Sequence, residues 1–271
     1  SLDSLLITWY ENGKKVSSGV GQKSFSLNAS TAGTETTVAV IIASPEGSIE
    51  TKIVIKPSIM VVLWEADDAY VPPFYRGKAL LTSDSSVKIV AMPEVKTKSG
   101  YVNPKNMTYS WRKDYTNDQE ASGYGKNYFI YTSDYLDPAS YIEVSATTLD
   151  QSHTSASSMN VATFQPKIVF YKNDETLGTL YETALGNGHR IVDKEIVVAT
   201  PYFISPKDIR IPRLEWFWYI NGARVVNESF QRNILPLQVE SGVSGTSKVR
   251  LEIEHKDKLT QTVNGEIQFE F

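Results

Sequence analysis

The side chains that could do chemistry are few in this sequence, and they are spread along it. The histidines His153, His189 and His255 are isolated from one another, and none has a second ligand at the spacing of a metal site. No Gly-x-Ser-x-Gly or phosphate-loop pattern occurs. The sequence therefore predicts no catalytic residue, no metal and no cofactor, and we expect a protein that is not an enzyme.

Three short acidic groups could bind calcium through carboxylate oxygens. They are Glu65 with Asp67 and Asp68, Asp114 with Asp118, and Asp134 with Asp137. Oxygen-rich loops suit calcium, but none of these groups has the spacing of a defined calcium-binding loop. Solvated loops are the simpler interpretation, and no metal site is predicted.

The most distinctive stretch covers residues 67–80, where aromatic residues alternate with prolines and basic residues. Such side chains can stack on a sugar or hold a peptide. Four positions recur later in the chain and are expected to be structural, namely Phe74, Tyr75, Ala79 and Leu80. Four others do not recur and are expected to form a variable surface, namely Pro72, Pro73, Arg76 and Lys78. The candidate ligand-binding residues are Tyr70, Pro72, Pro73, Phe74, Arg76 and Lys78.

Composition excludes several classes of partner. The chain has 271 residues, with 27 Lys and Arg against 31 Asp and Glu, for a net charge of −4. This balance, without a basic run, argues against a nucleic-acid partner. Apolar stretches are too short to span a membrane, and no secretory signal is present, so an exported protein would have lost its signal or carry it upstream. The absence of cysteine favours a bacterial or archaeal chain and also fits a cytosolic one.

A tryptophan motif recurs at nearly constant spacing. Ile-Thr-Trp-Tyr surrounds Trp9, Tyr-Ser-Trp-Arg surrounds Trp111, and Phe-Trp-Tyr-Ile surrounds Trp218. The three tryptophans are 102 and 107 residues apart. A period of this size indicates tandem copies of one domain.

Each copy is expected to be a β-sandwich. Apolar and polar residues alternate with period two, and turn signals such as Asn12-Gly13 and Asn221-Gly222 separate the runs. About seven short strands in roughly 100 residues, with a Trp on the third, is the immunoglobulin-like (Ig-like) pattern. We therefore expect an all-β chain of tandem Ig-like β-sandwiches, in which Trp9, Trp111 and Trp218 mark the cores.

The repeats predict three domains, at residues 1–57, 58–166 and 167–271, and the first is incomplete at its N-terminus. Counting back 47 residues from Trp9, the distance from Trp64 to Trp111, places its first strand before residue 1. Three explanations stay open. The chain is a fragment of a longer protein, or a strand from another chain completes the first repeat, or the half-domain packs differently.

The motifs resemble a known group of sequences. Trp9-Tyr10-x-Asn12-Gly13, Leu63-Trp64-Glu65-Ala66 and the stretch from Tyr70 to Leu80 are similar to a functionally uncharacterised family of tandem Ig-like repeat proteins, secreted or surface-associated, from candidate-phyla (Parcubacteria-type) bacteria. The resemblance implies an N-terminal signal peptide and further upstream sequence. It implies no activity and no binding residues.

The expected function is a non-enzymatic extracellular or cell-surface rod of tandem Ig-like domains, structural or adhesive. One alternative is a subunit of a surface filament that self-associates by strand exchange through the first repeat. Another is a glycan- or peptide-binding module that uses the loop from Tyr70 to Lys78. The expected partners are thus a second copy, or a surface glycan or protein.

Overall fold

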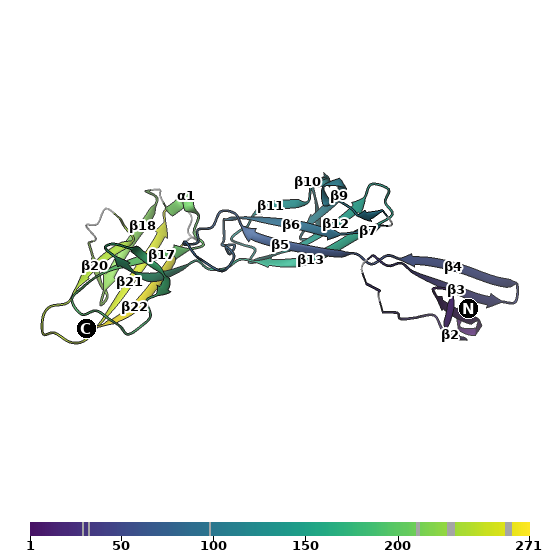
Figure 1. Cartoon of the computed structure of the whole chain (residues 1–271), viewed down its shortest axis with the longest axis horizontal. Coiled ribbons are helices and arrows are strands. Elements are labelled where there is room, and N and C mark those ends of the chain that lie inside the picture. Colours follow the sequence, from purple (N-terminus) through teal and green to yellow (C-terminus); the bar gives the residue numbers. More distant parts are fainter. Residues whose placement is uncertain (29, 32, 98, 210–211, 227–230, 258–261) are drawn as a thin grey trace. The chain divides into compact units, whose positions relative to one another are not determined.

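The computed structural model describes residues 1–271 except 29, 32, 98, 210–211, 227–230 and 258–261 (Figure 1). Nearly all regular structure is β, as the alternating sequence predicts. The described helical segments are short: η1 (Leu2–Ser4), η2 (Pro104–Asn106) and α1 (Pro206–Ile209). None of the helices in the described part of the chain is long and apolar enough to cross a membrane.

The chain divides into two compact units, each built from three segments. One contains residues 1–63, 90–129 and 141–159, and the other contains residues 64–89, 130–140 and 160–271. The middle repeat contributes strands to both units, so compactness does not follow the sequence repeat. The domain boundaries after residues 57 and 166 stay a prediction.

The first repeat forms one antiparallel sheet in the order β2-β1-β3-β4. Its strands are β1 (Leu6–Glu11), β2 (Lys14–Val20), β3 (Thr36–Ser44) and β4 (Gly47–Ile55). The register places Trp9 opposite Val40 and Ile42 opposite Ile49, so these apolar side chains share one face. The first repeat therefore presents one Trp-bearing sheet, and its assignment as a partial Ig-like domain stays a prediction.

The middle repeat has two sheets, in the orders β10-β9-β12-β13 and β11-β6-β5, and a small hairpin of β7 and β8. The strands of the first sheet are β9 (Met107–Lys113), β10 (Thr116–Tyr124), β12 (Ala139–Thr148) and β13 (Thr154–Ala162). The remaining strands are β5 (Ile59–Ala66), β6 (Ser86–Glu94), β7 (Lys96–Thr97), β8 (Gly100–Tyr101) and β11 (Tyr128–Thr132). Buried and less buried residues alternate along β12, the period expected when one face of a sheet meets a core.

The last repeat is a sandwich of a four-stranded and a five-stranded sheet, in the orders β15-β14-β17-β20 and β16-β22-β21-β18-β19. The first sheet contains β14 (Lys167–Asp174), β15 (Gly178–Ala184), β17 (Lys194–Tyr202) and β20 (Ile234–Gln238). The second contains β16 (His189–Arg190), β18 (Leu214–Ile220), β19 (Ala223–Val225), β21 (Thr246–His255) and β22 (Val263–Glu270). Phe170 and Val197 from one sheet pack with Trp218 and Leu251 from the other in a single buried cluster. Burial of this apolar area drives the two sheets together.

The tryptophan position is held in the same way in all three repeats. Each indole Nε1 donates a hydrogen bond of 2.9 Å to a backbone carbonyl in the segment after the next strand. The acceptors are Gln22 for Trp9, Lys126 for Trp111 and Arg232 for Trp218. Trp111 and Trp218 are fully buried, as predicted for core markers, whereas Trp9 is only partly buried because the described first repeat has one sheet.

The residue three positions after each acceptor turns toward the core. Phe25 stacks on Trp9 with ring centroids 5.9 Å apart, and Phe129 lies 5.7 Å from Trp111. The same spacing in the last repeat leads to Leu235, which is buried. Two sheets of the middle repeat thus meet through Trp111 on β9 and Phe129 on β11.

The turn after each tryptophan strand is also repeated. Asn12, Asp114 and Asn221 have left-handed φ angles of 50°, 49° and 48°. The side-chain oxygen of each accepts an N–H from a neighbouring strand, and its own N–H donates to the carbonyl of that same residue. The partners are Thr37, Tyr141 and Lys248. The turns predicted at Asn12-Gly13 and Asn221-Gly222 are confirmed, and Asp114-Tyr115 forms the equivalent turn in the middle repeat.

Candidate functional site

The predicted ligand-binding loop lies between β5 and β6, and backbone hydrogen bonds stabilise its base and its tip. The Ala66 N–H donates to the Ala79 carbonyl at 3.1 Å, which closes the base of the loop. At its tip the Tyr75 N–H donates to the Pro72 carbonyl at 3.3 Å, and Phe74 takes a left-handed φ of 63°. A tight turn of this kind directs the residue at its apex away from the protein.

One side of the loop packs against the last repeat, within the same compact unit. The Tyr70 N–H donates to the Ile204 carbonyl at 2.8 Å, and the Phe203 N–H donates back to the Tyr70 carbonyl at 2.7 Å. The ring of Tyr75 meets Tyr202 edge-on at 5.5 Å. Tyr70 and Tyr75 therefore hold the loop in place, and Tyr70 is a structural residue as well as a predicted ligand contact.

A group of tyrosines surrounds this contact. The hydroxyl groups of Tyr171 and Tyr202 are hydrogen-bonded to each other. Burial raises the pKa of Tyr70 to about 12, with a further contribution from nearby Tyr181. Burial and the Tyr171 hydroxyl raise the pKa of Tyr202 as well. Burial disfavours the phenolate form, so Tyr70 and Tyr202 are neutral at physiological pH.

The other side of the loop faces solvent. Two of its residues differ in burial from what the sequence predicted. Phe74 was expected to be structural, yet 88% of it is exposed, because it occupies the apex of the turn. Pro72 was expected at the surface, yet it is buried beneath that turn. Pro73 and Arg76 are exposed, as predicted. The structure thus leaves Pro73, Phe74 and Arg76 together as the accessible part of the candidate site, and their role in binding stays a prediction.

Lys78 is exposed but already has an aromatic partner. Its Nζ lies 3.2 Å from the centroid of the Trp64 ring, the geometry of a cation–π contact. Partial burial lowers the pKa of Lys78, and the nearby Glu65 carboxylate opposes that shift. Lys78 therefore covers Trp64 before any ligand is bound.

The scattered histidines have separate surroundings. His189 Nε2 lies 2.7 Å from Glu195, and the buried His255 accepts the Asp257 N–H through Nδ1 at 3.1 Å. His153 belongs to a local cluster with Ser152 and Asp150. There the serine hydroxyl donates to the aspartate at 2.7 Å and lies 2.7 Å from His153 Nδ1.

The order of groups in that local cluster is wrong for nucleophilic catalysis. A catalytic triad places the histidine between the serine and the acid, so that the imidazole takes the serine proton. Here Ser152 stands between His153 and Asp150. Hydrogen bonds from Thr148 and Ser152 lower the pKa of Asp150 to about 2, which makes it a poor base. The arrangement is a turn stabilised by side chains.

Several carboxylates of the acidic groups accept hydrogen bonds within the protein. Asp114 accepts the Tyr141 N–H at 2.8 Å, Asp118 accepts the Ala121 N–H at 2.8 Å, and Asp68 accepts the Ser205 hydroxyl at 2.8 Å. In the described part of the chain, no three His, Cys, Asp or Glu residues are grouped so that they could hold a metal ion. Asp114 and Asp118 thus stabilise turns, and Asp68 links its loop to the last repeat.

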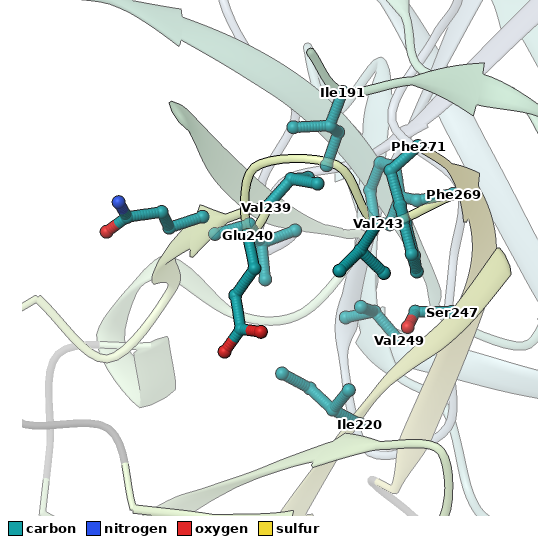
Figure 2. Close-up of a pocket in the computed structure, with 11 residues that line it drawn as sticks. Ile191, Ile220, Val239, Glu240, Val243, Ser247, Val249, Phe269 and Phe271 are labelled. Carbon is teal, nitrogen blue, oxygen red and sulfur yellow. The ribbon is translucent and has the colours of Figure 1, made fainter. Parts of the chain in front are cut away.

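A cavity of about 250 Å³ opens at one end of the last sandwich (Figure 2). It is lined by core residues from both sheets and by the segment that joins β20 to β21. No sequence pattern distinguishes these residues, since each belongs to an ordinary alternating strand or a polar turn. Their convergence depends on how the two sheets meet.

No family model matches this chain, and no curated protein matches it either. Solved structures that match this chain include Sidekick-1 immunoglobulin domains 1–4, at 10% identity and a TM-score of 0.24, covering 98% of this chain and 65% of that chain. The fibronectin(III)-like modules of Clostridium thermocellum CbhA match at 13% identity and a TM-score of 0.26, covering 78% of this chain and 93% of that chain. Bacteroides ovatus SGBP-B, in complex with a mixed-linkage heptasaccharide, matches at 12% identity and a TM-score of 0.26, covering 99% of this chain and 60% of that chain. At these TM-scores, the Ig-like assignment rests on the strand orders and repeated contacts described above.

Proposed function

We propose that this chain is a non-enzymatic structural or adhesive array of tandem Ig-like domains, displayed outside the cell or on its surface. The observation that carries the proposal is that the structural contacts of the core repeat along the chain, whereas the polar and aromatic surface groups do not. The Trp111–Lys126 contact has equivalents in both other repeats, at the same 2.9 Å. The polar cluster at Asp150 and the aromatic loop at Phe74 occur in one repeat each. Repetition of framework without repetition of polar chemistry supports an array whose use is to extend, display or connect.

Cell-surface display is tested with an antibody against the chain. Intact cells of the source organism should be labelled without permeabilisation, and protease added outside should remove the label. Labelling that requires permeabilisation would contradict the proposal. A bacterial source of the Parcubacteria type is part of the same proposal, supported by the sequence resemblance alone.

An array should also extend in steps under force. Pulling one chain should unfold the last repeat, residues 167–271, separately from the rest. Its 105 residues should add roughly 350 Å of contour length, at about 3.4 Å per residue. A single event that releases the whole chain at once would contradict independent repeats.

A second candidate function, assembly by strand exchange, is favoured by the open face of the first sheet. Ile49 and Ile53 lie on the face that carries Trp9, and they are 61% and 60% exposed. In the last repeat the corresponding face, around Trp218, is covered by the sheet that contains β14 and β17. Apolar strands supplied by another copy would cover this face and would form backbone hydrogen bonds with the edge strand β4.

Mass in solution tests strand exchange directly. Size-exclusion chromatography with light scattering should give assemblies that grow with protein concentration. The double variant Ile49→Lys and Ile53→Lys should reduce them, because it places two charges on the open face. Val54→Lys is the matched control, since Val54 is 50% exposed on the opposite face of the same strand. A monomer at all concentrations, or equal effects of both variants, would refute this mode of assembly.

A further inference from the structure

We propose that the cavity at the end of the last sandwich binds a small hydrophobic amine, an aromatic or branched aliphatic group that carries one ammonium. Part of its wall belongs to the core itself. It is lined by Phe269, Val249 and Ile191, whose exposed fractions are 1%, 1% and 3%. Their positions are fixed by the packing of both sheets, so this part of the site is formed before a ligand arrives.

The mouth of the cavity is formed by a short, anchored turn between β20 and β21 (Figure 2). The Val239 N–H donates to the Asp193 carbonyl at 2.9 Å, which holds one end. Gly245 and Phe271 exchange two backbone hydrogen bonds, of 2.9 and 3.0 Å, which hold the other. Between these anchors the Val243 N–H donates to the Glu240 carbonyl at 3.2 Å, and the Val243 side chain is 50% exposed at the tip of the turn.

The size and lining of the cavity select the apolar part of the ligand. An apolar cavity of about 150 Å³ holds a benzene molecule, and this one measures about 250 Å³. It therefore has room for a bicyclic aromatic group or a branched alkyl group. Phe269 and Phe271 supply aromatic surface on one side, and Ile220 supplies an aliphatic side chain. A polar ligand without such a group would leave these surfaces in contact with water.

Charge selects the head group. Among the residues that line the cavity, Glu240 alone is charged, and the other polar groups belong to Gln238 and Ser247. Glu240 is exposed, and Figure 2 shows its side chain among the residues that line the cavity. An ammonium at the mouth would meet this carboxylate, whereas a carboxylate ligand would be repelled.

Three indole compounds of nearly equal size separate these requirements. They are tryptamine, a cation; tryptophol, which is neutral; and indole-3-acetate, an anion. The affinity of the full chain for each is measured by calorimetry, and shifts of the backbone amides of Val239, Val243 and Ser247 locate the site by NMR. We expect tryptamine to bind with a dissociation constant on the order of 100 μM. We expect tryptophol to bind about fivefold more weakly and indole-3-acetate to bind least.

Variants assign the contacts. Glu240→Gln should reduce tryptamine binding to the level of tryptophol, whereas Glu254→Gln, an exposed carboxylate away from the cavity, should not. Val243→Phe should fill the mouth and weaken all three ligands. Equal binding of the cation and the neutral compound would overturn the role of Glu240. No binding of any of the three, or shifts confined to other residues, would overturn the site.

Discussion

The indole Nε1 of Trp111 lies 2.9 Å from the backbone carbonyl oxygen of Lys126, fifteen residues further along the chain. This bond satisfies a polar atom that the buried indole brings into the core, and it fixes the chain just before β11. Phe129 follows three residues later and packs on the same ring. One contact therefore places the tryptophan, the entry to the next strand and the aromatic residue that joins the two sheets.

Substitution of Trp111 should separate packing from hydrogen bonding. Trp111→Ala should lower the free energy of unfolding by about 3–5 kcal/mol, since it leaves a large cavity. Trp111→Phe keeps most of the ring but leaves the Lys126 carbonyl without its donor, and it should cost about 1–3 kcal/mol. Urea denaturation measures both. Trp64→Phe, at a partly buried position, is the control, and an equal loss there would show that the Lys126 contact has no special role.

The repeated turn makes a second test. Asn221→Ala removes the acceptor for the Lys248 N–H and places a residue with a Cβ and no polar side chain at a φ of 48°. We expect a loss of about 1–2 kcal/mol in the free energy of unfolding. Asn221→Gly tolerates the left-handed backbone and should lose less. If the two variants unfold alike, the backbone angle does not contribute.

Gly265 on β22 should reject a side chain. A Cβ at this position would lie 2.6 Å from the Cβ of Ile168 on β14, too close for two carbon atoms. Gly265→Ala should therefore force the strands apart and destabilise the last repeat by about 1–3 kcal/mol. Gly186→Ala is the matched control, because a Cβ there meets no atom within 4 Å. Thermal unfolding of the two variants compares them, and similar melting temperatures would refute the close approach.

Tyr70 and Tyr109 should titrate late, as should Tyr202. Burial raises the pKa of Tyr70 to about 12, and burial raises that of Tyr109 to about 12. The folded chain then holds these protons at a pH where the unfolded chain, with a tyrosine pKa near 10.0, releases them. This stability is present in full below pH 10 and is lost as pH rises from 10 to 12. Phenolate absorbance should show that Tyr70→Phe and Tyr109→Phe each remove one late-titrating group. Unchanged titration curves would contradict the burial of both hydroxyls.

The candidate loop should separate into a structural and an accessible side. Tyr75→Ala removes a ring that packs on Tyr202 and Phe203, and it should destabilise the chain by about 3 kcal/mol or more. Phe74→Ala should change stability by less than about 0.5 kcal/mol, since Phe74 is 88% exposed. A glycan and peptide array then tests the loop as a binding site. Binding that is lost in Phe74→Ala alone would support it, and binding that survives would exclude Phe74.

Sequence reasoning succeeded where structure is set by local chemistry. The Asn12-Gly13 and Asn221-Gly222 hairpins follow from residues that accept a left-handed backbone, and the alternation along β12 follows from the pleat of a strand. It failed at residue 74 because a recurring apolar residue was taken to be buried. Its counterpart Leu180 lies within strand β15, whereas Phe74 lies at the apex of the turn from Pro72 to Tyr75, and that turn directs its side chain outward.

The sequence by itself determined the tandem repeat, the all-β class and the tryptophans that mark the cores, because period, alternation and turn residues are properties of neighbouring positions. Only the tertiary structure decided that Tyr70 and Tyr75 face the last repeat, that Ile49 and Ile53 stay exposed, and that Glu240 borders an apolar cavity. These facts depend on which sheet face meets which, and residues far apart in the chain determine that together. No local pattern records the distance between two sheets, so burial and cavities appear only when the sheets are in contact.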